Sequence, residues 1–266
     1  MPAAVQRSGV SSKRIGTEVD IEPVYAPRVD RIAPTRRPEG KNAGTQLWRE
    51  LLFLHWKVPV EALRPLVPAR LSLDLWEGEA YVGVVPFLMR EIAPSWWPKA
   101  LGFDFLECNL RTYVHLDGEG PGVYFFSLEA SSWLAVQAAR VGWGLPYHHA
   151  RMSTSTVEDV VAYETVRRGD GAKHAVKYRV GEALGPSEPG SLEHFFLERY
   201  LLYSEKGGQL VKGQVHHPPY PAQRATVLEV EDSLIAAAGL PAVEGPPALV
   251  HYAAGVDVEV FSPYSV

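Results

Sequence analysis

Residues 105–116 alternate between apolar and polar side chains, and this alternation is the most informative pattern in the chain. Side chains along an extended strand point in turn to opposite faces, so the pattern predicts a strand with two unlike faces. One face carries Leu106, Cys108, Leu110, Thr112, Val114 and Leu116. The other face carries Glu107, Asn109, Arg111, Tyr113 and His115. The first face belongs to a core, whereas the second is either a wetted outer surface or the polar lining of a cavity.

The rest of the chain beyond residue 45 is also predicted to be mostly β. Apolar or alternating runs bounded by turn residues predict strands at 50–57, 71–76, 81–89, 123–131, 149–156, 160–167, 174–180, 200–204, 210–217, 224–230 and 250–261. Short helices are predicted at 59–67, 131–141 and 232–239, where proline, serine and aspartate are typical first residues. These elements do not alternate as βαβ units. The fold class is therefore mainly β with short helices, in an antiparallel barrel or closed double sheet.

Composition separates a tail from a body. Residues 1–43 contain five prolines and one aromatic residue, with eight Lys/Arg against five Asp/Glu. This segment is predicted to be a disordered or extended N-terminal tail, and residues 44–266 a single domain. The body carries 18 Lys/Arg against 26 Asp/Glu, within a formal net charge of −5 for the chain. An acidic body argues against nucleic acid as a partner, because phosphate contacts need clustered Lys and Arg.

Several classes of protein are not expected. The sequence lacks an apolar run long enough for a membrane span and a hydrophobic signal core, so neither a membrane partner nor export is expected. The single cysteine, Cys108, excludes an intrachain disulfide and suits a reducing cytoplasm. No glycine-rich dinucleotide fingerprint, phosphate-binding loop, GxSxG elbow or CxxC pair is present. We therefore predict a cytoplasmic protein without a cofactor.

The polar face of the strand at 105–116 is the first candidate site. Glu107, Asn109 and Arg111 place an acid, an amide and a guanidinium on one face. An arginine can hold a carboxylate with two hydrogen bonds. A glutamate can act as acid or base where burial raises its pKa. An exposed strand face also carries such residues, so the pattern by itself leaves both interpretations open.

Two histidine-containing segments are further candidates. Residues 144–149 run from a helix end into a strand and offer the phenol of Tyr147 with His148 and His149. His216 and His217 precede a Pro-Pro-Tyr run. Adjacent histidines on a strand point to opposite faces, and no HxH or HExxH spacing is present, so no metal site is predicted. A helix-stopping loop with solvent-exposed histidines is the alternative interpretation of residues 144–149.

Several segments together resemble one known family. They are FLHWKVPVEALRPLVPARLSLDLWEGEAYVGVVPF, ECNLRTYV, GVYFFSLEA, GLPYHHARM, ERYLLYS and GQVHHPPYP. In this order they resemble the YqjF-like family of uncharacterised bacterial proteins, a domain of unknown function in the acetoacetate decarboxylase-like superfamily. The resemblance covers residues 46–262. It implies a closed, cone-shaped, mainly antiparallel β-barrel with helices at its rim and a central cavity.

The resemblance also implies where the chemistry of that superfamily would lie. Its decarboxylases form a Schiff base through a lysine that follows a proline, with a second lysine beside it. The similar place here is Pro146-Tyr147-His148, and a phenol cannot form an imine. The family's glutamate corresponds to Glu107, and an arginine of its first strand falls close to His55. Lys57 is the only other lysine expected near the cavity.

These observations support three hypotheses. The first is a barrel that binds a small molecule such as a carboxylate in a cavity lined by Glu107, Asn109, Arg111 and Tyr147, with Arg111 holding an anionic or carbonyl group. The candidate catalytic residues are Glu107, Tyr147 and His148, and the candidate ligand-binding residues are His55, Asn109 and Arg111. The second is an enzyme that applies general acid–base chemistry to a small keto acid or related carbonyl compound. The third is a structural or partner-binding protein with a vestigial cavity. A homo-oligomer is compatible with all three.

Overall fold

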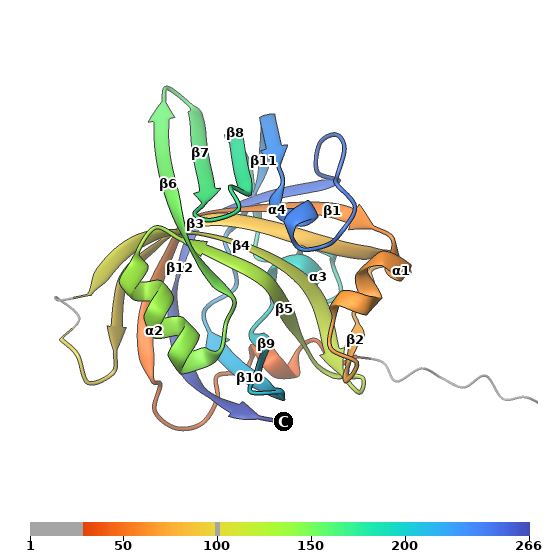
Figure 1. The fold of residues 1–266 in the computed structure, drawn as a ribbon, viewed down its shortest axis with the longest axis vertical. Coiled ribbons are helices and arrows are strands. Elements are labelled where there is room, and N and C mark those ends of the chain that lie inside the picture. The colour runs from red at the N-terminus through yellow and green to blue at the C-terminus, as the bar shows by residue number, and fades with distance from the viewer. Residues whose placement is uncertain (1–28, 99–101) are drawn as a thin grey trace, which may run out of the picture.

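The computed structural model describes residues 29–98 and 102–266, and strands dominate it (Figure 1). The strands are β1 (Gly44–Val58), β2 (Leu71–Leu73), β3 (Ala80–Pro94), β4 (Phe103–Leu116), β5 (Glu119–Ala130), β6 (Tyr147–Val157), β7 (Val160–Arg167), β8 (Lys173–Gly185), β9 (Leu201–Lys206), β10 (Gln209–His216), β11 (Ala222–Asp232) and β12 (Leu249–Ser265). The helices are α1 (Val60–Leu63), α2 (Trp133–Trp143), α3 (Leu192–Leu197) and α4 (Leu234–Ala237), with 3-10 turns η1 (Ala33–Thr35) and η2 (Arg64–Leu66). None of the helices in this described part has the length and apolar character needed to cross a membrane.

The strands form one sheet that closes on itself. Its order is β10-β9-β5-β6-β7-β8-β11-β12-β1-β3-β4-β2, and two further pairings join β10 to β12 and β5 to β4. Most neighbours are antiparallel, whereas β5 pairs in parallel with β9 at 122–124 and with β6 at 128–130. The expected mainly β, closed and largely antiparallel fold is therefore confirmed.

The central strands β1, β3 and β4 are buried on both faces. One face packs toward β7, β8 and α4, and Figure 1 shows β7 and β8 above the central strands. That core contains Leu52, Leu54, Val82, Val84, Leu110, Tyr163, Val176, Tyr178 and Leu234. The opposite face packs toward α3 and β10 through Leu51, Phe53, Val85, Phe87, Leu197, Val215 and Tyr220. We call the first region the closed core, because the second region contains the cavity described below.

The predicted helix at 131–141 corresponds to α2. Ser132 caps it, because its hydroxyl accepts a hydrogen bond from the backbone N–H of Ala135. Gly144 ends it with a left-handed backbone at φ 67°, which glycine adopts without steric cost. Helix α2 lies beside the start of β6, so it fixes the position of the residues that follow it (Figure 1).

Residues 29–43, the described part of the predicted tail, contact the β-structure. Arg31 pairs with Asp74, and Arg37 Nε pairs with Glu259 Oε2 at 2.6 Å. The backbone carbonyl of Pro34 accepts a hydrogen bond from the Gln214 amide at 3.1 Å. Residues 1–28 of the predicted tail lie outside the described residues. We call residues 29–43 the N-terminal segment below.

Candidate functional site

The polar face of β4 borders a cavity of about 160 Å³. Glu107, Asn109 and Arg111 line this cavity, while Cys108 and Leu110 belong to the closed core on the other side of the strand. The alternation seen in the sequence therefore separates a core face from a cavity face. Strand β4 pairs with β3 and β5, and the three polar side chains lie in continuous register with β3, whereas the register with β5 shifts between Leu110 and Arg111.

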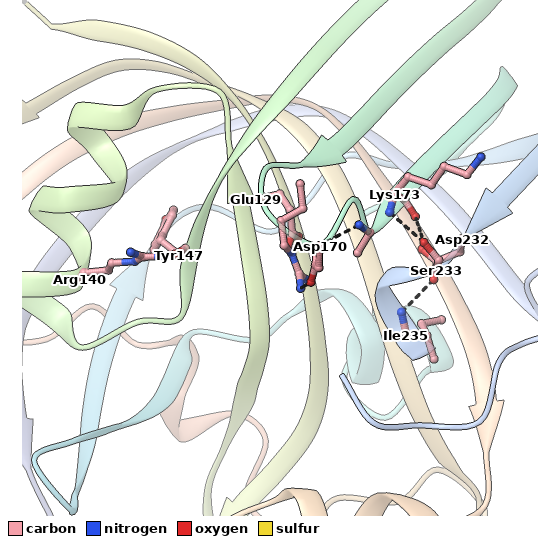
Figure 2. Close-up of polar contacts among 10 residues, drawn as sticks. Glu129, Arg140, Tyr147, Asp170, Lys173, Asp232, Ser233 and Ile235 are labelled. Atoms are coloured by element: carbon pink, nitrogen blue, oxygen red, sulfur yellow. Dashed lines mark hydrogen bonds and ion pairs between the residues drawn. The ribbon is translucent and has the colours of Figure 1, made fainter. Parts of the chain in front are cut away.

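Glu107 and Tyr147 contact each other at the cavity wall. The Tyr147 hydroxyl donates a hydrogen bond to Glu107 Oε2 at 2.7 Å, and both side chains are buried. The contact forms because β5 lies between their strands: Glu107 faces Ala130 and Leu128 faces Tyr147 in register. From α2, Arg140 Nε donates to the backbone carbonyl of Tyr147 at 2.7 Å and fixes the start of β6 (Figure 2).

Burial sets the protonation of this pair. It raises the pKa of Glu107 to about 8, although the hydrogen bond from Tyr147 acts in the opposite direction. Burial and the neighbouring Glu107 also raise the pKa of Tyr147 well above its ordinary value. At neutral pH both groups are therefore mainly protonated. The pair can donate and accept hydrogen bonds, and Glu107 can release a proton near pH 8.

Arg111 is a buried cation with weak compensation. Its exposed fraction is 8%, and its Nη2 lies 3.4 Å from the Phe196 carbonyl oxygen. Its Nε has no acceptor among the described residues, and its guanidinium carbon lies 5.5 Å from the centre of the Phe53 ring. No carboxylate of the described residues forms an ion pair with it, in contrast to Arg199, which pairs with Asp74. A buried charge without a partner is costly in free energy.

Arg199 is a cavity residue that sequence reasoning missed. It follows α3 and lines the same cavity as Arg111. Its Nε donates to the Phe195 carbonyl at 2.5 Å, and its Nη1 pairs with Asp74 Oδ2 at 2.7 Å. Nothing in the run Glu198-Arg199-Tyr200 distinguishes this arginine from a solvated one. The signal is tertiary, because it depends on how α3 packs beneath β4.

The structure does not bring His148 and His55 into the cavity. His148 follows Tyr147 on β6, points to the other face and is half-buried. Burial and the nearby Arg167 lower its pKa. His55 is fully buried but does not border the cavity, and its Nε2 lies 2.5 Å from the Tyr113 hydroxyl.

Lys57 lies away from the cavity, so the expectation that placed it nearby is wrong. Its side chain is 54% exposed and forms a 3.8 Å ion pair with Glu79. It follows His55 by two residues, but it belongs to the end of β1 that reaches the surface. No lysine of the described residues lines the cavity. An imine-forming amine is therefore missing from the described wall.

The remaining histidines do not form a ligand set. The described residues contain no group of three or more His, Cys, Asp or Glu side chains that could hold a metal ion. His149 and His216 are half-buried and do not border the cavity. The ring of His217 stacks on Tyr200, with 4.4 Å between ring centres, and burial lowers its pKa to about 4. His217 therefore supports the aromatic wall as a neutral ring.

A second buried polar cluster lies on the closed-core side. Arg167 Nη2 pairs with Glu129 Oε1 at 2.6 Å, and its Nη1 pairs with Asp170 at 3.0 Å. Glu129 and Asp170 lie next to each other in Figure 2, because both contact this arginine. Nearby, His174 Nδ1 lies 2.9 Å from Asp232 Oδ2, and both side chains are buried. The Arg167 guanidinium is therefore paired with carboxylates of the protein.

Solved structures with the same architecture define the class of fold. An acetoacetate decarboxylase-like enzyme from Sphingomonas wittichii RW1 is 13% identical with a TM-score of 0.59, covering 85% of this chain and 94% of that chain. The enduracididine biosynthesis enzyme MppR, complexed with pyruvate, is 13% identical with a TM-score of 0.58, covering 86% and 93%. At this identity the likeness shows the fold alone. The fold is that of the acetoacetate decarboxylase-like proteins.

Sequence comparison identifies the family within that class. A family model, DUF2071, described as "Uncharacterized conserved protein", matches residues 45–257. "Uncharacterized protein YqjF" of Bacillus subtilis (strain 168) is 38% identical over 224 residues, covering 83% of this chain and 91% of that protein. The chain therefore belongs to the DUF2071 family, and the resemblance to YqjF-like proteins inferred from its segments is confirmed.

Proposed function

We propose that the cavity binds a small organic acid whose carboxylate contacts Arg111 and whose opposite end contacts Glu107 and Tyr147. The observation that carries this proposal is the unpaired burial of Arg111 at the cavity wall. A buried arginine without a carboxylate costs free energy, and a ligand carboxylate offsets that cost through two charge-assisted hydrogen bonds. Glu107 does not fill this role, because its raised pKa keeps it mainly neutral.

The size and lining of the cavity restrict the ligand. An apolar cavity of roughly 150 Å³ accommodates a molecule of the size of benzene. The cavity here, at about 160 Å³, suits a short-chain acid and not a cofactor or a nucleotide. Its wall between the polar groups is apolar, with Val85, Phe87, Val123 and Leu128. The description of MppR as complexed with pyruvate agrees with a small acid in a cavity of this fold.

Isothermal titration calorimetry with pyruvate and propionate tests the proposal. We expect both acids to bind the wild-type protein, and Arg111→Gln to weaken binding by about thirtyfold or more, because losing one partner of a buried charge pair costs about 2 kcal/mol or more. Arg90→Gln is the matched control, since Arg90 is exposed and pairs with Asp104. The proposal would be contradicted if the wild-type protein bound neither pyruvate nor propionate, or if Arg111→Gln and Arg90→Gln bound these acids equally well.

A second candidate function is general acid–base catalysis on a small keto acid or a related carbonyl compound. The contact between Glu107 and Tyr147 favours it, because a carboxyl group with a pKa of about 8 can exchange a proton with a bound substrate near neutral pH. A screen of keto acids, enol esters and lactones tests this function. Turnover that is lost in Glu107→Gln while acid binding persists would establish catalysis. Absence of turnover would contradict this second function and leave acid binding as the proposed function.

A further inference from the structure

Two cavity arginines meet at the C-terminal end of α3. The Phe195 carbonyl accepts a hydrogen bond from Arg199 Nε at 2.5 Å, and the next carbonyl, of Phe196, lies 3.4 Å from Arg111 Nη2. Both guanidinium groups also face the Tyr113 ring, at 5.0 Å for Arg199 and 5.9 Å for Arg111. The partial negative charge of a helix C-terminus favours cations, which explains why two arginines are tolerated at one place.

The carboxylate nearest to Arg199 is shared with a third arginine. Asp74 is buried, and its Oδ2 pairs with Arg199 at 2.7 Å. Its other oxygen, Oδ1, pairs with Arg31 of the N-terminal segment. Arg31 and Arg199 also lie over the same Phe195 ring, at 4.9 Å and 4.2 Å from its centre. One carboxylate between two guanidinium groups leaves one positive charge of this cluster without a counter-charge.

Glu107 is the only acidic side chain among the described residues that line the cavity, and it does not supply the missing negative charge. Glu107 is mainly protonated because burial raises its pKa to about 8. Glu198 accepts hydrogen bonds from the Tyr200 hydroxyl and the Tyr220 backbone N–H, and it does not line the cavity. Burial lowers the pKa of His55 and of His217, so neither adds a positive charge at neutral pH. The excess charge therefore comes from the arginines.

From this arrangement we infer that the cavity prefers small dianionic acids, with Arg199 as a second anion-binding group whose charge Arg31 maintains by sharing Asp74. The inference rests on the proposed function, because Arg111 supplies the first contact. It assigns a role to the N-terminal segment. Without Arg31, the negative charge of Asp74 would be balanced entirely by Arg199, and the net positive charge beside the cavity would fall by one. The dianion is either a dicarboxylate or a phosphate group. Both carry two negative charges on oxygen atoms that accept hydrogen bonds.

Calorimetric titration of the full chain with malonate, inorganic phosphate and propionate at pH 7.5 tests the inference. We expect malonate or phosphate to bind about tenfold more tightly than propionate, and the stronger of the two identifies the source of the dianion. In Arg31→Gln this preference should fall about fivefold, whereas propionate binding changes little. Arg31→Lys, which keeps the charge, should retain the preference and shows that the effect does not come from misfolding.

Arg37→Gln is the matched control, because Arg37 lies in the same N-terminal segment but pairs with Glu259. Equal affinity for the monoanion and the dianions would overturn the inference, and loss of propionate binding in Arg111→Gln would then still support the proposed function. An unchanged preference in Arg31→Gln, or the same fall in Arg37→Gln, would overturn the role of Arg31. Absence of binding to all three anions would overturn the inference and the proposed function together.

Discussion

Arg111 and Arg167 are almost equally buried, at 8% and 7% exposure, but they lie on opposite sides of the central strands and differ in their partners. Arg167 pairs with Glu129 at 2.6 Å and with Asp170 at 3.0 Å, so its charge is neutralised within the protein. Arg111 borders a cavity and has no carboxylate partner among the described residues, only a long contact with a carbonyl oxygen and contacts with Tyr113 and the Phe53 ring. Burial of an ionisable residue is thus common to both regions, and the missing counter-charge distinguishes the candidate site.

The largest expected effect on stability comes from removing the ion pair between Arg167 and Glu129. Arg167→Met should destabilise the protein by roughly 3–5 kcal/mol, because it leaves Glu129 as a buried carboxylate without a partner. Urea denaturation measures the change in the free energy of unfolding. The double variant Arg167→Met with Glu129→Leu removes both charges and should recover part of the loss. A single-variant loss below about 1 kcal/mol, the value typical of exposed pairs, would show that this pair is not a buried one.

The pH dependence of stability should report Glu107 on the cavity side. The folded protein keeps this proton up to about pH 8, whereas the unfolded chain releases it near 4.5, so stability from this group falls as pH rises between these values. Relative to Glu107→Gln, the wild-type protein should lose about 2–3 kcal/mol between pH 5.5 and 7.5. Urea denaturation across this range measures the difference. Parallel curves for the two proteins would contradict the raised pKa.

Arg111→Met should contrast with Arg167→Met. Removing an unpaired buried charge while keeping side-chain volume should leave the ligand-free protein as stable, or more stable by about 1 kcal/mol. The free energy of unfolding in urea checks this expectation. If the variant is destabilised as strongly as Arg167→Met, then Arg111 has a structural partner and the distinction between the two sides fails.

The smallest effect is expected at His148, which faces away from the cavity. His148→Gln should change acid affinity by less than about twofold and stability by less than about 0.5 kcal/mol, as for ordinary substitutions away from a site. Tyr147→Phe, one residue earlier on β6, removes the hydrogen bond to Glu107 and is the comparison variant. Calorimetric titration of both variants decides the matter. Equal loss of affinity in both would place His148 in the site.

Much of this arrangement could be predicted from the sequence because strand periodicity is local. The alternation from Glu107 to Arg111 separates a polar face from the face of Cys108, but by itself it leaves open whether the polar face borders a cavity or solvent. The same rule places His148 on the face opposite Tyr147, but the strand predicted there begins only at His149, whereas β6 begins at Tyr147. The proximity of Tyr147 to Glu107 came from family resemblance, since two strands separated along the chain meet only through β5.

Other features lay beyond the reach of a single sequence. Arg199 becomes a cavity residue because α3 carries it beneath β4, and no local period encodes that packing. The pairing of Arg31 with Asp74 joins a segment predicted as a tail to the loop after β2. Contacts of this kind join side chains that are distant in sequence. The strength of their charge interactions is set by burial, which no local pattern shows.

The pairing of β1 with β12, from Gly44 opposite Val260 to His55 opposite Leu249, has a consequence for synthesis on the ribosome. Residues 51–56 of β1 are buried on both faces, yet the second neighbour of this strand, β12, begins 191 residues after β1 ends (249 − 58). At about 5–20 residues per second, this edge stays open for about 10–40 s in each newly made chain. During that time it can pair with another nascent chain. Slower initiation or a chaperone that holds β1 should therefore raise the yield of folded protein more than any change at the cavity.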